Sequence, residues 1–549
     1  MSWRGWMTPL VFLLLAAVWT WPAPITAELL GRRADALGTV WFVSAAARLL
    51  PGLHDGLTGW PLGADYTRPD SWTMLLVGPL SALLGAPRVV ALVAFLGVTA
   101  SAWAAETFAR SIGARAPWSL VAGMAYAFSG LGSTAFIEGY PYHLADPWLP
   151  LFGAAWLRAV DADGRPRDGL AAAALFALAL GTSAWHGLAA AILGIGLLAA
   201  ARAQGVVRPR PVLAAATAVG VLALAYAAAF FSNAPASEVA SSGLGGLSTL
   251  SDRLLLHTAP GPAVDIDGRG QTAWFSAVML AGLAVAPVLV GRDWRVRALG
   301  LTALVALGLA LVPLPWASMA QWVPTSRAGA LAALQAAFGR FPERLGWAWL
   351  AAGGVVAARA LTELERIAGR WTWPLLAAAA LEPFVALRLP QRQAVSPGGA
   401  PSAYGASAGA VFDLWPEDLA RDPGWDLRVT NTDCFYQAAH GRPIADLCLL
   451  VPGQQSPRAR LGEWVTDALL DGDASSVEAR LSAFGFATIA WHPDVFRPST
   501  RSRLAEALAR VDGAPAESTD AGDHVVAFAL ASPAEGVAGA EAYAAWGAP

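Results

Sequence analysis

Long apolar runs recur along the first 390 residues of the chain, and most are long enough to cross a lipid bilayer as a helix. The first run covers 7–21 and ends in an aromatic Trp-Thr-Trp interface. A signal peptide with Thr26-Ala27 as its cleavage flank is an alternative, but the residues after the run are aromatic rather than small. We therefore expect an anchor, followed by further spans at 88–108, 117–136, 143–160, 169–185, 186–203, 211–231, 273–291, 298–314, 345–361 and 372–389.

The positive charges of the loops between these runs test how many of the runs are membrane spans. The sequence contains no lysine, so arginine supplies every fixed positive charge. Counted this way, five arginine-bearing loops fall on the side of Arg4, which the positive-inside rule assigns to the cytoplasm. We therefore predict about eleven spans, with the N-terminus inside and the C-terminus outside. The loops carry Arg110 and Arg115; Arg158, Arg165 and Arg167; Arg202, Arg208 and Arg210; Arg292, Arg295 and Arg297; and Arg359, Arg366 and Arg370.

The stretch 28–87 after the first span is polar and aromatic, and we predict that it forms an outer loop. Within it, the apolar residues of 35–50 recur every three or four positions, which predicts an interfacial helix. The run 72–84 contains Pro79 and is short, so we expect an interfacial or re-entrant helix. Counting it as a span would move every later arginine loop to the opposite face.

After the last run the composition changes to that of a soluble domain. The pattern predicts a transmembrane domain over 1–390, a Pro/Gly/Ser linker over 391–404, an extracytoplasmic α/β domain over 405–532 and a tail over 533–549. The α/β domain is expected from strands alternating with helices. The strands are predicted at 410–415, 486–492 and 524–530, and the helices at 461–470, 475–484 and 499–511.

Composition supports this class and excludes others. Of the 549 residues 56% are hydrophobic and 14% charged, against about 25% charged in soluble domains. The net charge of −3 gives no electrostatic case for nucleic acid. The only two cysteines, Cys434 and Cys448, lie 14 positions apart in the predicted outer domain. A disulfide there is the favoured interpretation, with two buried free thiols as the alternative.

Several acidic and aromatic side chains in the outer loops are candidates for chemistry. Asp35 lies just past the first span, where a carboxylate could act as a general base or simply stabilise a helix N-terminus. Asp65 and Asp70 lie further along the same loop. A second set, comprising Glu138, Tyr140, His143 and Trp148, surrounds the shortest outer loop as either a substrate site or an interfacial belt.

Two other patterns concern phosphate and metal. Arg340 and Arg344 flank the start of a late span, where guanidinium groups could bind a lipid phosphate or only snorkel to the interface. Asp265 and Asp267 form an Asp-x-Asp pair that could bind Mg²⁺ or Mn²⁺, although such short pairs are common by chance. No cofactor is firmly predicted, and no P-loop, GxSxG or HExxH motif points to another enzyme class.

The order of these features resembles the GT-C superfamily of membrane glycosyltransferases, and more closely the bacterial YfhO-like and related GT-C-like membrane proteins. An aspartate after the first span, a long outer loop with two interfacial helices and a C-terminal outer domain carry the resemblance. The matching stretches are ADALGTVWF (34–42), YHLADPWLPLFGAAWLR (142–158), RFPERLGWAWLAAGG (340–354), ALEPF (380–384), AVFDLWP (410–416), FYQAAHGRPI (435–444) and LSAFGFATIAWH (481–492).

The resemblance implies transfer of a sugar from a polyprenyl-phosphate donor to an envelope glycan, lipid or protein. Asp35 is then similar in role to the superfamily's general base, with Arg340 and Arg344 stabilising the departing lipid phosphate. No acidic pair adjoins Asp35, which favours a metal-independent reaction. The expected location is the bacterial inner membrane. The alternatives are a non-catalytic GT-C-like glycan- or lipid-binding protein, and a transporter or flippase, which the near absence of charges within the predicted spans disfavours.

Overall fold

The computed structural model describes most of the chain. The described residues are 3–21, 23–26, 29–30, 34–50, 54–65, 72–129, 131–132, 146–161, 163–207, 209–215, 217–219, 276–311, 345–385, 392–393, 400–406, 408–416, 432–446, 448, 457–511, 514–520, 523–531 and 533–546.

The chain divides into two compact units, and the division does not follow chain order. The helical unit comprises Met1–Pro24, Asp70–Thr73 and Ala91–Gln391. The mixed unit comprises Ile25–Pro69, Met74–Val90 and Arg392–Pro549. Most of the predicted outer loop therefore folds with the C-terminal domain.

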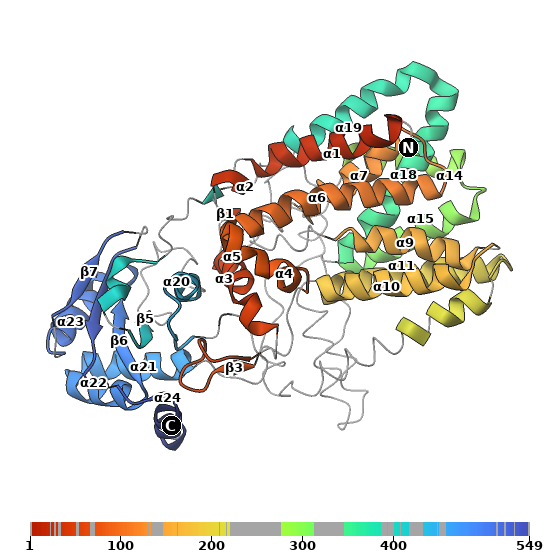
Figure 1. The fold of residues 1–549 in the computed structure, drawn as a ribbon. Coiled ribbons are helices and arrows are strands. Elements are labelled where there is room, and N and C mark those ends of the chain that lie inside the picture. The colour runs from red at the N-terminus through yellow and green to blue at the C-terminus, as the bar shows by residue number, and fades with distance from the viewer. Residues whose placement is uncertain are drawn as a thin grey trace. The chain divides into compact units, whose positions relative to one another are not determined.

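The helices of the helical unit follow the predicted spans. Helices α9, α10 and α11 lie side by side in it (Figure 1). Of the predicted span 211–231, the described residues 211–215 and 217–219 are helical. The bounds are α1 (Trp3–Thr20), α6 (Ala86–Ser111), α7 (Ser119–Ala127), α9 (Trp148–Val160), α10 (Pro166–Thr182), α11 (Ala184–Ala203), α14 (Ala277–Leu289), α15 (Trp294–Leu311), α18 (Gly346–Ala368) and α19 (Trp373–Val385).

Small residues bring α18 close to its neighbours, α7, α14 and α15. A Cβ added at Gly354 would lie 3.4 Å from the backbone of Ala122 in α7. At Gly282 of α14 an added Cβ would lie 2.8 Å from the Cβ of Ala357, so a larger residue there would separate the two helices. Such small-residue contacts are typical of helices packed inside a bilayer, where hydrophobicity alone does not drive association.

Large apolar side chains point outward on the same helices. Leu96, Ile195 and Val288 are 54%, 69% and 86% exposed. Water would make such exposure costly, whereas lipid would not. By length and hydropathy, α6 and Trp185–Ala203 of α11 qualify as membrane spans among the described residues, and shorter apolar helices cover Thr8–Thr20, Ala36–Leu49, Thr73–Leu84 and Ala277–Leu289.

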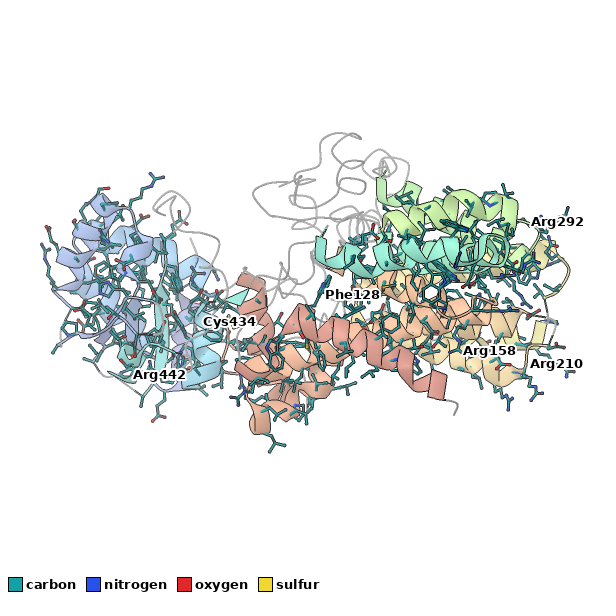
Figure 2. The ribbon with its side chains drawn as sticks, turned by 90° about the horizontal axis from the view of Figure 1, so that it is seen from above. Phe128, Arg158, Arg210, Arg292, Cys434 and Arg442 are labelled. Carbon is teal, nitrogen blue, oxygen red and sulfur yellow. A yellow bond between two sulfur atoms is a disulfide. The ribbon has the colours of Figure 1, made fainter. Side chains whose placement is uncertain are left out.

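The arginines used to predict topology gather at one end of the helical unit. Figure 2 shows Arg158, Arg210 and Arg292 at this end and Phe128 toward the other. An ion pair between Arg295 and Asp161 joins the first turn of α15 to the end of α9 there. The grouping on one end is what the positive-inside assignment requires, because all these loops must share a face.

The mixed unit is built on a four-stranded sheet in the order β5-β6-β8-β7. Strands β5 (Ala410–Leu414) and β6 (Phe486–Trp491) are parallel, and β8 (Val525–Ala529) runs antiparallel to β6 and to the edge strand β7 (Ala516–Ser518). The predicted helices are present as α21 (Pro457–Leu470), α22 (Ala474–Ala483) and α23 (Pro498–Leu508). Figure 1 shows these helices beside the sheet. Their buried apolar residues form one core with the strands, including Phe412, Leu461, Val477, Phe486 and Leu504.

Three elements of this unit differ from the sequence expectation. The predicted tail 533–549 contains helix α24 (Gly536–Ala545), whose Tyr543 packs edge-on against Phe484. Strand β7 is only three residues long, too short for an alternating pattern to show. Helix α20 (Thr432–His440) lies in a stretch for which the pattern predicts no element.

The outer loop contributes short elements to the mixed unit. Helix α3 (Ala34–Leu49) matches the predicted interfacial helix, and the predicted helix 72–84 is divided into α4 (Trp72–Val77), a 3-10 turn (Gly78–Leu80) and α5 (Ser81–Leu84). Gly78 packs against Ala46 of α3, where an added Cβ would lie 2.0 Å from that methyl group. Two-residue strands pair β1 (Leu29–Leu30) with β4 (Arg392–Gln393) and β2 (His54–Asp55) with β3 (Ala64–Asp65).

Candidate functional site

The candidate base lies in the first turn of a well-defined helix. Asp35 is the second residue of α3, but its side chain lies outside the described residues, as does that of Asp65. Trp148 is half-buried in the first turn of α9. The roles predicted for all of these residues remain predictions. Outside the described residues altogether lie Asp70, Glu138, Tyr140, His143, Asp265, Asp267, Arg340 and Arg344.

Helix α3, which carries Asp35, is held in position by contacts with the C-terminal domain. The indole N–H of Trp41 donates a buried hydrogen bond of 2.8 Å to Oε1 of Gln437 in α20. Trp41 is fully buried, one turn and a half along α3 from Asp35, and α3 packs along α20. A hydrogen bond between buried groups is costly to break, because either partner left alone loses its solvation without compensation. We infer that Gln437 sets the position of α3.

A second contact holds the loop that follows α3. The amides of Gly59 and Trp60 donate to the carbonyls of Asp446 and Ile444, at 2.8 and 2.9 Å, and the amide of Ile444 donates to Leu57 at 2.9 Å. The indole of Trp60 donates to the carbonyl of Phe484 at 3.2 Å. The backbone groups of this loop are therefore paired with the C-terminal domain, which fixes the loop's conformation.

An ion pair closes the same loop onto α3. The guanidinium of Arg48 lies 3.1 Å from the carboxylate of Asp55, and that carboxylate also accepts the amide of Leu57 at 3.1 Å. Asp55 is 2% exposed, so its charge needs both partners. The predicted outer loop is thus bound at β1, at Trp41, at Asp55 and at residues 57–60.

Helix α20 is itself held by a disulfide. Cys434 and Cys448 are joined, so of the two interpretations of the cysteine pair the structure has the bridge. Asp433 and Asp446 lie close enough to the sulfur of Cys434 to resemble a metal site. The disulfide occupies that sulfur, however, and burial together with Asp446 raises the pKa of Asp433 well above its usual range. A neutral carboxylic acid and an oxidised sulfur do not form a cation site.

A buried polar cluster fixes the other side of α20. His492, which follows β6, contacts Asp523 through Nδ1 at 2.7 Å and Asp413 of β5 through Nε2 at 3.3 Å. The hydroxyl of Tyr436 in α20 donates to Asp523 at 3.0 Å, and that of Tyr404 donates to Asp413. We call these five residues the His492 cluster.

Charge within this cluster decides its protonation. Burial alone would lower the pKa of His492, but the carboxylates of Asp523 and Asp413 outweigh it and raise the pKa to about 9. Burial would raise the pKa of Asp523, yet the imidazolium and its hydrogen bonds lower it. Trp415 stacks on the imidazole at 3.6 Å between ring centroids. His492 is fully buried, so the cluster acts as an anchor for α20 and touches no substrate.

The helical unit contains a polar group that the sequence analysis missed. Nε2 of His186 lies 3.4 Å from Oδ2 of Asp146, and the hydroxyl of Tyr126 donates to the backbone carbonyl of Asp146 at 3.2 Å. Trp347 covers the group, with its ring 5.3 Å from His186 and 5.4 Å from Tyr126. All four side chains are at least 97% buried.

The position of this group is informative. Asp146 lies two residues before the start of α9, and His186 and Trp347 lie in the first turns of α11 and α18. The last turns of these helices carry Arg158, Arg202 and Arg366. The group therefore lies at the end of these helices opposite the arginines.

Ionisable residues inside the predicted spans are the signal that could have indicated this group from the sequence. Such residues are rare in membranes and usually functional. Asp146 lies within the quoted YHLADPWLPLFGAAWLR stretch, and His186 begins a predicted span. With Glu106 of α6, also buried, they correct the expectation that charges lie almost wholly in loops, and so weaken the case against a transporter.

Comparison with known proteins gives a fold. No family model and no curated protein matches the chain. Among solved structures, the arabinofuranosyltransferase AftD from Mycobacteria has a TM-score of 0.60 at 16% identity, covering 96% of this chain and 40% of AftD. A mutant of AftD gives a TM-score of 0.54 at 17% identity, covering 96% of this chain and 41% of the mutant.

Weaker likenesses, both with a TM-score of 0.44 and 13% identity, are to two other membrane-lipid-associated structures. One is the oligosaccharyltransferase AglB from Archaeoglobus fulgidus, in complex with an inhibitory peptide and a dolichol-phosphate, with coverage of 90% of this chain and 70% of AglB. The other is ArnT from Cupriavidus metallidurans bound to undecaprenyl phosphate, with coverage of 97% of this chain and 100% of ArnT.

The likeness to AftD shows that this chain shares its fold with that arabinofuranosyltransferase, in agreement with the glycosyltransferase fold expected from the sequence. It extends over nearly all of this chain, including both units, but the chain spans only 40% of the length of AftD. The narrower resemblance to YfhO-like proteins stays a prediction.

Proposed function

We propose that this chain is a membrane glycosyltransferase that transfers a sugar from a polyprenyl-phosphate donor to an acceptor of the cell envelope. The GT-C fold shared with an arabinofuranosyltransferase supports the reaction class. The site would lie on the outer face of a bacterial inner membrane, with the N-terminus in the cytoplasm and the mixed unit outside. Lipid-linked donors suit that face, because the phosphate ester already supplies the driving force and no nucleotide is needed.

In this proposal Asp35 is the general base. Its carboxylate takes the proton of the acceptor hydroxyl as that oxygen attacks the anomeric carbon of the sugar. The bond from the anomeric carbon to the phosphate oxygen breaks, and the lipid phosphate leaves with the electron pair. Arg340 and Arg344 stabilise the departing charge through charge-assisted hydrogen bonds. No metal takes part in these steps.

The observation that carries the proposal is the fixation of α3 by the C-terminal domain. A general base must be held within hydrogen-bond reach of the proton that it removes, and small displacements cost large factors in rate. The Trp41–Gln437 hydrogen bond and the paired loop at Trp60 provide that restraint. The buried Asp146–His186 pair would similarly restrain the loop that carries Glu138 and Tyr140.

Transfer in proteoliposomes tests the proposal. The full chain is reconstituted with radiolabelled polyprenyl-phosphate arabinofuranose and, separately, with mannose and glucose donors, together with an envelope glycan fraction as acceptor. Asp35→Asn should lower transfer by about 10²–10⁴-fold, the usual loss for a removed general base. Asp471→Asn is the matched control, since Asp471 is an exposed acid of the same unit.

The outcomes separate the rival functions. Transfer gives a labelled acceptor and free polyprenyl phosphate, whereas a flippase only moves the intact lipid to the opposite leaflet. A stably folded Asp35→Asn protein with full transfer activity would remove Asp35 as the base. A wild-type protein that binds donor or glycan without transfer or relocation would favour the non-catalytic alternative.

A further inference from the structure

A cavity in the mixed unit lies between α23 and the sheet. Its volume is about 590 Å³, within the range of small-ligand sites. Its floor is one row of side chains across three strands, because Trp491 pairs with Val526 and Val526 pairs with Glu517. Residues directly opposite in neighbouring strands point to the same face of a sheet, so these three side chains form a continuous surface.

The cavity exists because the covering helix presents small residues. Ala505 of α23 and Ala509, the residue that follows the end of this helix, lie one turn apart, line the cavity and remain exposed. At most helix–sheet contacts of this unit, larger residues such as Leu504 fill the space. The small side chains of the two alanines leave space over the side chains of Trp491, Val526 and Glu517.

The rim is polar and nearly balanced in charge. Arg501 pairs with Asp494 at 3.1 Å, and Nε2 of His524 lies 2.8 Å from Glu517. These side chains are between 26% and 62% exposed. One arginine, one histidine and two carboxylates do not select strongly for an anion or a cation. They favour a neutral ligand with many hydroxyl groups, because each hydroxyl both donates and accepts.

The floor and rim together fit a sugar. Trp491, which is 6% exposed, and the half-buried Val526 give the cavity an apolar floor. A sugar ring supplies both an apolar C–H face for the Trp491–Val526 surface and hydroxyl oxygens for the donors around it.

We propose that this cavity is a glycan-binding site of the mixed unit, and that it holds a neutral oligosaccharide chain as the acceptor of the transfer reaction. The assignment of the glycan as acceptor rests on the proposed function, whereas the binding itself does not. The site would retain the growing chain near the membrane without taking part in the chemistry.

Binding to the full chain in nanodiscs tests this site. Fluorescently labelled oligosaccharides of arabinofuranose, mannose and glucose are titrated, and affinity is read from fluorescence polarisation. We expect at least one to bind with a Kd on the order of 1 mM or tighter. Glu517→Gln and Arg501→Gln should each weaken binding about tenfold, the scale of one charged hydrogen bond.

Two further kinds of variant separate the site from general effects on folding. Ala505→Leu narrows the cavity without removing any polar group and should weaken binding at least tenfold. Glu506→Gln on α23 and Arg510→Gln just after its end, both outside the cavity lining, should bind like the wild type. No binding by any of the three oligosaccharides, or binding that Ala505→Leu leaves unchanged, would overturn the proposal.

The transfer assay distinguishes this proposal from the catalytic one. If both hold, Ala505→Leu raises the KM for the acceptor and leaves kcat unchanged, whereas Asp35→Asn lowers kcat and leaves oligosaccharide binding intact. Normal binding with a fully active Asp35→Asn protein overturns the catalytic assignment alone. Transfer that depends on Asp35 with no effect of Ala505→Leu on binding overturns the glycan site alone.

Discussion

At the scale of single residues, the protonation of His492 has a measurable consequence for stability. Its pKa in the folded protein is raised from 6.5 to about 9 by Asp523 and Asp413. Between these two values the folded state holds a proton that the unfolded state has lost, so stability falls as pH rises. A shift of this size corresponds to about 3 kcal/mol, present in full below pH 6.5 and lost above pH 9.

His440 acts in the opposite direction. Burial lowers its pKa from 6.5 to about 4, beside the stacked ring of Tyr404. Between these values the unfolded state gains a proton that the folded state excludes, so stability falls as pH decreases. The two histidines together predict a stability maximum of the mixed unit near pH 6.5.

Thermal unfolding of the detergent-solubilised chain between pH 4 and 10 checks this maximum. In the variant His492→Gln the decline above pH 6.5 should disappear, while the decline on the acid side remains. His440→Gln should show the converse. A profile that stays flat from pH 6.5 to 9 in the wild type would contradict the protonated state assigned to His492.

At the scale of elements, the contact between α3 and α20 should be energetically coupled. Trp41→Phe leaves Oε1 of Gln437 without its donor, and Gln437→Leu leaves the Trp41 N–H without its acceptor. Each should cost about 1–3 kcal/mol. The double variant should cost less than the sum, because no buried group is then left alone.

Denaturant unfolding of the four proteins measures this coupling. The matched control is Trp60→Phe combined with Gln437→Leu, since the Trp60 indole donates to Phe484 and not to Gln437. That pair should be additive to within about 0.5 kcal/mol. Additivity for Trp41 and Gln437 as well would mean that the hydrogen bond does not restrain α3.

The elements also show what the sequence could and could not predict. Periodicity was sufficient for α3, and short, nearly continuous apolar runs were sufficient for the strands at Ala410–Leu414 and Phe486–Trp491, which are buried at every position. It could not predict α20, whose buried face includes Asp433, Tyr436 and Gln437. Those polar residues are buried because they have partners far away in sequence, and periodicity carries no information about such partners.

The same reason explains the polar groups that were missed. The His492 cluster and the Asp146–His186 pair each join residues from separate elements. Sequence can mark a lone ionisable residue in an apolar run, but it cannot say which other residue meets it. Asp35, by contrast, was selected by its position after the first span and by family resemblance, and its side-chain contacts remain a prediction.

At the scale of the whole molecule, topology decides whether the proposed chemistry has access to a lipid-linked donor. The arginine loops predict that 161–165 lies in the cytoplasm and the mixed unit outside. The competing count, with 72–84 as an additional span, reverses both. The structure does not favour that count. It assigns Met74–Val90 to the mixed unit, and a 3-10 turn at Gly78–Leu80 interrupts the helical run.

Single-cysteine labelling distinguishes the two counts. The native cysteines are joined and do not react, so Asp163→Cys and Ser499→Cys, both at exposed positions, can serve as reporters. With a membrane-impermeant maleimide, intact spheroplasts should label Ser499→Cys at once and Asp163→Cys only after permeabilisation. The reverse pattern would place the mixed unit in the cytoplasm. Since α3 and its Asp35 belong to that unit, an outward-facing transfer reaction would then be impossible, whatever the chemistry of the carboxylate.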